Sequence, residues 1–183
     1  MDYFLKSQRL GFRCWQNQDL PLAMKLWGDP KVSALLGGPF TPDQVRGRLR
    51  LEIERKEDLG MQYWPIFLLD GDRHAGCAGL RPWGDEPRVY ELGFHLRRDL
   101  WGQGLATEAS HAVIDYAFRN LGAEALMAGH HPSNRASRKV LLKLGFVYQG
   151  MLFYPPTGVV EPVYRLGPIP AWPAAGRGTV AVS

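Results

Sequence analysis

Apolar and polar positions alternate over several short runs of the chain. The clearest runs cover residues 61–70, 73–82 and 87–98, and a period of two predicts β-strands. Asp70-Gly71-Asp72 separates the first two runs and predicts a hairpin turn. The same alternation, over shorter stretches, predicts strands at residues 9–15, 123–131, 146–154 and 161–166.

Helical spacing fills the intervals between these runs. Val45, Leu49 and Ile53 recur every four residues after Thr41, which predicts an amphipathic helix that ends at Gly60. Further helices are expected at residues 17–38 (in two parts), 104–120 and 133–145. The order of strands and helices predicts one mixed α/β domain over residues 1–167, followed by a Pro/Gly/Ala-rich tail at 168–183.

Composition narrows the class of protein. The 183 residues are 45% hydrophobic and 22% charged, which is typical of a globular domain. A net charge of +4 is too weak to indicate nucleic acid binding, and no apolar run is long enough to predict a membrane span. The N-terminus lacks the apolar core of a secretory signal, and two cysteines do not make a disulfide framework. We therefore expect a cytoplasmic protein.

The stretch WGQGLATEA joins a predicted strand to a predicted helix and is the strongest chemical signal. Small residues at 102, 104 and 106 let the main chain approach a ligand, and the N–H groups of residues 103–107 can converge on one anion. The alternative is that Gly102 and Gly104 only shape the turn. A nucleotide P-loop would need a lysine here, and Thr107 replaces the third glycine of a dinucleotide fingerprint.

RRDLWGQGLATEA resembles the acyl-CoA pyrophosphate loop of the GNAT superfamily of N-acetyltransferases. Gly104 and Ala106 match the last two positions of the family's Gln/Arg-x-x-Gly-x-Gly/Ala pattern, and Trp101 replaces the usual Gln or Arg. Four other segments match the family in the same order along the chain: QRLGFRCW, WGDPKV, ELGFHL and NRASRKVLLKLGF. Trp101 followed by Gly-x-Gly resembles the Rim-type branch, whose members acetylate the N-termini of ribosomal proteins. The resemblance implies a mixed, largely antiparallel sheet of six to seven strands flanked by about four helices.

The resemblance also implies how acetyl-CoA binds as a co-substrate. The pyrophosphate is expected on the main chain of Gly102, Gln103, Gly104, Leu105, Ala106 and Thr107. The pantetheine arm is expected between two diverging strands, paired with the main chain of Leu96 and Arg97 and bonded by Asn134. The residue types alone allow a simpler role for Asn134, as a helix N-cap.

Two residues are expected to act on the reacting groups. Glu91 occupies a strand position where a carboxylate is costly unless it is ion-paired or lines a wet cleft. The resemblance makes it the general base. Leu141 stands where many GNAT enzymes carry an acidic tyrosine, so Ser137 or water is expected to protonate the thiolate.

The expected reaction is direct acetyl transfer from acetyl-CoA to a primary amine. The leading acceptor is a peptide or protein N-terminal α-amine, and a small-molecule amine is the alternative. A non-catalytic acyl-CoA sensor is a second class of function. No metal is expected, because the adjacent His130 and His131 point to opposite faces of a strand. Cys77 and His95 are expected to be structural, and the protein to be a monomer or homodimer.

Overall fold

One eight-stranded sheet forms the centre of the fold in a computed structural model that describes residues 2–167. The strands are β1 (Leu5–Lys6), β2 (Leu10–Phe12), β3 (Tyr63–Leu68), β4 (His74–Pro82), β5 (Val89–Leu96), β6 (Ala125–Gly129), β7 (Val147–Tyr154) and β8 (Val159–Leu166). Their order is β1-β2-β3-β4-β5-β6-β8-β7. Only β5 and β6 run parallel, so the prediction of a mixed, largely antiparallel sheet is confirmed.

Five α-helices and two 3₁₀ turns connect the strands. They are η1 (Asn17–Asp19), α1 (Leu20–Trp27), α2 (Pro30–Ser33), α3 (Pro42–Leu59), η2 (Arg98–Leu100), α4 (Leu105–Asn120) and α5 (Arg135–Lys143). The start of α3 shows why its sequence prediction holds. The Thr41 side chain accepts the Gln44 N–H, the Gln44 side chain accepts the Thr41 N–H, and Gly60 ends the helix with a φ of 71°.

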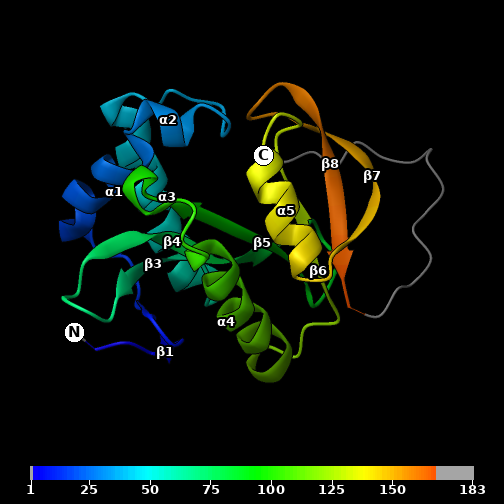
Figure 1. Ribbon diagram of the computed structural model, residues 1–183, viewed down its shortest axis with the longest axis horizontal. Coiled ribbons are helices and arrows are strands. Elements are labelled where there is room, and N and C mark those ends of the chain that lie inside the picture. The colour runs from blue at the N-terminus through cyan, green and yellow to red at the C-terminus, as the bar shows by residue number, and fades with distance from the viewer. Residues whose placement is uncertain (1, 168–183) are drawn as a thin grey trace.

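The helices cover the two faces of the sheet unevenly (Figure 1). α4 and α5 pack on one face, where Leu105, Val113 and Leu141 join the largest apolar cluster. α1 and α3 pack on the other face around Trp27 and Val45. The hairpin of β7 and β8 completes the sheet beyond β6.

The parallel strands separate within the sheet, as the resemblance implied. β5 and β6 pair from Val89 opposite Ala125 to Glu91 opposite Met127, and the pairing ends there. Beyond that point β5 continues to Leu96 paired with β4 alone, while β6 stays paired with β8. The separation leaves main-chain groups of both strands without a strand partner on the side of the opening.

The first strands differ from the sequence prediction. The run predicted at 9–15 is a strand only over Leu10–Phe12. Pro65 stands opposite Arg13, and its carbonyl accepts the Arg13 N–H at 3.4 Å. Because proline has no N–H, the second hydrogen bond of this pair cannot form. The two residues of β1 make an eighth strand where six to seven were expected. The predicted tail at 168–183 lies outside the described residues. No helix in residues 2–167 is long and apolar enough to cross a membrane.

Candidate functional site

The glycine loop ends in a helix N-terminus whose amides have no partner among the residues that the structure describes. Gly102 and Gly104 both have a φ of 77°, which favours glycine, and the loop passes directly into α4. The first helical hydrogen bond runs from the Glu108 N–H to the Gly104 carbonyl, at 3.1 Å. Within residues 2–167, the N–H groups at 102–107 meet no acceptor. These amides, together with the helix dipole, form an anion site.

A clasp from the N-terminal strands holds this loop in place. The Glu108 carboxylate accepts the Ser7 hydroxyl at 2.7 Å, the Arg9 N–H at 2.7 Å and the Arg9 Nε at 2.6 Å. The Arg9 guanidinium also donates to the Gln103 carbonyl at 3.1 Å. Burial alone would raise the pKa of Glu108, but these hydrogen bonds and the charge of Arg9 outweigh it and lower the pKa. The clasp therefore places a cation beside the helix N-terminus.

A cavity of about 530 Å³ opens at the same place. Gly104 and Thr107 line it from the loop and α4, and Lys6, Arg9 and Lys143 bring positive charge from three other segments. Arg97 and Arg98 flank the loop in sequence, but Arg97 ion-pairs with Asp99 at 3.2 Å. Glu108 and Asp115 also line the cavity, so its lining carries both signs of charge, with one more cation than carboxylates.

The edge of β5 provides part of the main-chain surface expected to bind the pantetheine arm. The Arg97 N–H donates to the Ala75 carbonyl at 2.9 Å, and the Arg97 carbonyl accepts the Leu100 N–H at 3.0 Å. Both main-chain groups of Arg97 are thus occupied within the protein. Because successive residues of a strand alternate, the main chain of Leu96 points away from β4 towards the opening. Its carbonyl accepts the Trp101 indole N–H at 2.9 Å.

Asn134 and Ser137 lie at the N-terminus of α5. The Asn134 side-chain oxygen accepts the Ser137 N–H at 3.0 Å, so Asn134 is the helix N-cap. This bond leaves its amide nitrogen and the Ser137 hydroxyl without a partner in the described part of the chain, and both side chains are half-buried. Leu141, in place of the familiar tyrosine, is buried in the core. The helix therefore offers polar groups only from its first turn.

Glu91 is ion-paired, which is one of the two environments expected for it. Arg81 donates to its two carboxylate oxygens at 2.8 and 2.7 Å, and the Tyr63 hydroxyl donates at 3.2 Å. Arg81 also donates to the Tyr154 hydroxyl at 3.1 Å. Gly93 makes this arrangement possible, because a Cβ there would lie 2.2 Å from the Tyr63 ring. About a fifth of the Glu91 side chain, 19%, remains exposed.

A second carboxylate was missed in the sequence. Glu161 of β8 is buried, and its neighbour Val163 packs with Val89 and Met127 on the face of the sheet that carries Glu91. The same reasoning that selected Glu91, a carboxylate in an otherwise apolar strand, could have found it. Arg9 and Glu108 were also missed, since they are 99 positions apart and nothing in the sequence pairs them.

The histidines and cysteines take structural positions. The Trp27 indole N–H donates to His95 Nδ1 at 3.3 Å, and Cys77 Sγ lies 3.5 Å from the same nitrogen. Burial, with the charges of Arg48 and Arg81, holds the pKa of His95 well below its usual value, so it is neutral. Burial also keeps Cys77 protonated. In residues 2–167 no group of three or more His, Cys, Asp or Glu side chains is arranged to hold a metal ion.

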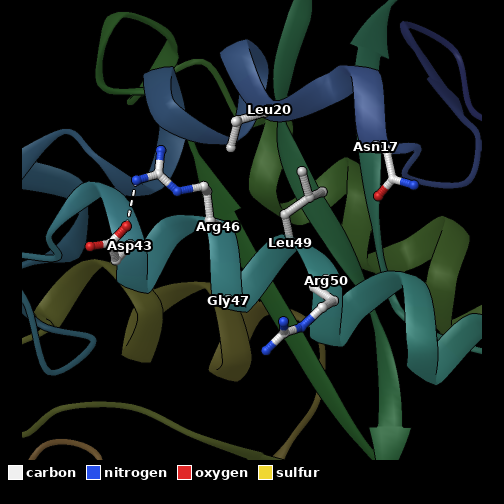
Figure 2. A pocket seen from close by; sticks show the side chains of 7 residues that line it. All are labelled: Asn17, Leu20, Asp43, Arg46, Gly47, Leu49 and Arg50. Carbon is white, nitrogen blue, oxygen red and sulfur yellow. Dashed lines mark hydrogen bonds and ion pairs between the residues drawn. The ribbon is translucent and has the colours of Figure 1, made fainter.

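A separate groove of about 430 Å³ lies between α1 and α3 (Figure 2). Arg46 and Arg50 project from α3 along it, and Arg46 ion-pairs with Asp43. None of its lining residues belongs to the predicted site. The predicted binding residues lie in the loop and the first turn of α4, at the open edge of β5 at Leu96, and in the first turn of α5. Glu91 faces the opposite side of the sheet, towards α1 and α3.

Comparisons with known proteins point to one family. A family model described as an acetyltransferase (GNAT) domain matches residues 9–147. A protein described as uncharacterized N-acetyltransferase p20 of Bacillus licheniformis is 29% identical over 81% of this chain and 84% of its own. The FsC-acetyl coenzyme A-N(2)-transacetylase of Aspergillus fumigatus is 33% identical over 75% of this chain and 64% of its own.

Solved structures share the fold. An acetyltransferase from Agrobacterium tumefaciens superposes with a TM-score of 0.77 at 26% identity, covering 92% of this chain and 98% of its own. RimL, a ribosomal L7/L12 α-N-protein acetyltransferase solved in complex with coenzyme A, superposes with a TM-score of 0.74 at 18% identity. That match covers 87% of this chain and 94% of RimL.

Proposed function

The chain belongs to the GNAT family of acetyltransferases and is an acetyl-CoA-dependent N-acetyltransferase, and we propose that its acceptor is a peptide or protein N-terminal α-amine. The observation that carries the placement of the reaction is the separation of β5 from β6 beside the free N-terminus of α4. An acetyl thioester that enters there from the cavity has access to both faces of the sheet.

Each part of the opening has a role in the proposal. Main-chain amides from Gly102 to Thr107 bind the pyrophosphate, with Arg9 as a neighbouring cation. Asn134 caps α5 through its oxygen and offers its amide nitrogen to the pantetheine arm. The main chain of Leu96 faces the opening and is available to the pantetheine arm. Arg97 makes no hydrogen bond to the arm in this proposal, because its main-chain groups are already bonded within the protein.

The reaction proceeds by direct attack in a ternary complex. Ser137 lies with α4 and α5 on the thiol side, where its hydroxyl or a water returns a proton to the leaving thiolate. Glu91 lies on the amine side, where its ion pair with Arg81 holds the carboxylate in a fixed position to orient the acceptor. The α-amine acceptor is supported by the order of motifs shared with the Rim-type branch and by the fold in common with RimL.

A small-molecule amine is the second candidate acceptor. The Aspergillus fumigatus relative, 33% identical to this chain, is named for acetyl transfer to an N(2) nitrogen and not to a protein N-terminus, which supports an acceptor other than a peptide α-amine. The two candidates differ in what must enter the acceptor side, since a peptide needs room for a chain beyond the reacting nitrogen.

Release of free CoA thiol from acetyl-CoA, measured against a panel of amines, tests the proposal. The panel pairs peptides that have a free N-terminus with the same peptides blocked at that nitrogen, and adds polyamines and amino acids. Turnover of the free peptides and not of the blocked ones is expected. Turnover of the small amines alone would transfer the proposal to the second candidate, and binding of CoA without turnover of any amine would contradict both.

A further inference from the structure

Glu161 is a buried carboxylate on the face of the sheet that carries Glu91. Only 6% of the residue is exposed, although it lies on β8 near the end of the sheet. Strand alternation puts it on the same face as Val163, which packs with Met127 of β6 and Val89 of β5. Met127 is opposite Glu91 in the last β5–β6 pair, so Glu161 and Glu91 lie on the same face of the sheet, and the charge of Glu91 acts on Glu161.

The two oxygens of Glu161 have different surroundings. Oε1 accepts the Thr157 hydroxyl at 2.7 Å. Oε2 lies 3.8 Å from the point that a Cβ on Gly129 would occupy, so it reaches the end of β6. Among residues 2–167, Oε2 has neither a hydrogen-bond donor nor a cation as its partner. The absence of a side chain at Gly129 keeps the approach to this oxygen clear.

Glu161 and Glu91 form a contrasting pair. Glu91 is held by Arg81, whereas Glu161 receives one hydrogen bond from a neutral hydroxyl. Burial raises the pKa of Glu161, the Thr157 hydrogen bond and the charge of His131 lower it by less, and the charge of Glu91 adds the smallest, raising effect. The strand residue opposite it on β7 is the apolar Leu152. Such a carboxylate attracts and holds a proton more readily than an ion-paired one.

We propose that Glu161 is the catalytic residue that takes the proton from the acceptor ammonium, while the Arg81–Glu91 pair only orients it. Oε2 accepts one proton, and the freed lone pair attacks the thioester carbonyl. The C–N bond forms, the C–S bond breaks, and the nitrogen's second proton goes to the thiolate through Ser137 or water. Glu161 then releases its proton to solvent. This inference rests on the proposed acetyl transfer and assigns its base.

The test compares E161Q with wild type on an amine that the wild-type enzyme acetylates. Rates at saturating acetyl-CoA are measured across pH, with E57Q, at an exposed position on α3, as the matched control. A base must be deprotonated, so the wild-type rate rises with pH along an acidic limb. E161Q is expected to lose this limb and to lower kcat by about 100-fold or more, with KM for acetyl-CoA unchanged.

T157V provides a second readout that does not depend on E161Q folding well. Loss of the Thr157 hydroxyl removes a contact that lowers the pKa of Glu161, so the acidic limb is expected to move to higher pH while the rate at alkaline pH is kept. A Thr157 with only a structural role would leave the limb in place.

Three outcomes would overturn the assignment. One is an E161Q enzyme that keeps both rate and limb, another is a defect confined to KM for the amine, and the third is an unmoved limb in T157V. In each case wild-type turnover leaves the acetyltransferase proposal intact. Failure of the wild-type enzyme to acetylate any amine is a different result, since it contradicts the proposed acceptor and the base together.

Discussion

Replacing Gly104 with alanine tests the proposed anion site at the N-terminus of α4. The substitution has two effects, backbone strain at a left-handed position and loss of anion binding, and these can be measured separately. Gly104 has a φ of 77°, and a Cβ there would meet only Arg9, at 3.8 Å. The protein itself therefore has room for the methyl group, and the cost of folding is that of φ alone, roughly 1–2 kcal/mol. For a chain of this length that lowers Tm by roughly 2–8 °C.

Gly122 provides a matched control at the other end of the same helix. Its φ is 63°, and a Cβ there has nothing within 4 Å. G122A should therefore lower Tm by about as much as G104A. The new methyl group lies in open space at Gly122, whereas at Gly104 it lies near Arg9 at the N-terminus of α4, where the free amides are.

The assay is the rise in Tm on adding CoA. At 100 times the wild-type Kd, bound ligand stabilises a protein by about 2.7 kcal/mol, and a tenfold weaker Kd reduces this to about 1.4 kcal/mol. Each lost amide–phosphate hydrogen bond is worth roughly 1.5–3 kcal/mol, so tenfold is a lower bound for G104A. G104A should lose at least half of the CoA-induced rise and G122A none. Equal CoA-induced rises in the two variants would refute the placement of the pyrophosphate.

Three further substitutions probe the supports of the site. E108Q should destabilise the protein by about 1–2 kcal/mol at neutral pH, because the folded-state pKa of Glu108 is lowered and its carboxylate stabilises the fold. Urea unfolding measures the difference in midpoint between wild type and E108Q, and this difference should shrink as pH falls through that pKa. N134A should lower the free energy of unfolding by about 1 kcal/mol, measured as a lower Tm, because it removes the side-chain oxygen that caps α5 at the Ser137 N–H. It should also raise KM for acetyl-CoA, because it removes the free amide. G37A should lower Tm by more than the strain at its φ of 92° alone, because its Cβ would lie 2.1 Å from the Pro156 carbonyl oxygen.

The sequence predicts the elements that depend on local pattern. Thr41 and Gly60 bound α3 as expected, and the alternating runs became β3, β4 and β5 within a few residues. The glycine loop was predicted for the same reason, because its left-handed turns fall on Gly102 and Gly104, which are close together in the sequence. A two-residue strand such as β1 has too few positions to show a period, and the end of β2 depends on Pro65, more than fifty residues away.

Contacts between distant segments decide what the sequence could not show. Glu108 reads as an ordinary first-turn acid of α4, but the clasp is formed by Ser7 and Arg9 from the other end of the chain. Asn134 has one role that the structure shows and one that stays a prediction. Its oxygen caps α5, as the local pattern suggests, whereas binding of the pantetheine arm by its nitrogen is the prediction.

Sheet register explains why two carboxylates on one face have different chemistry. Arg81 is directly opposite Glu91 in the β4–β5 pair. This cross-strand neighbour supplies the positive charge that pairs with the Glu91 carboxylate. Glu161 is opposite Leu152 on β7, while β6 ends at Gly129 opposite Val163, so no strand residue faces Glu161 from that side. The charge of Glu91 is thus neutralised by its own sheet, whereas the charge of Glu161 awaits a cation from outside. In our proposal, a protonated amine that enters the opening beside β6 supplies that cation.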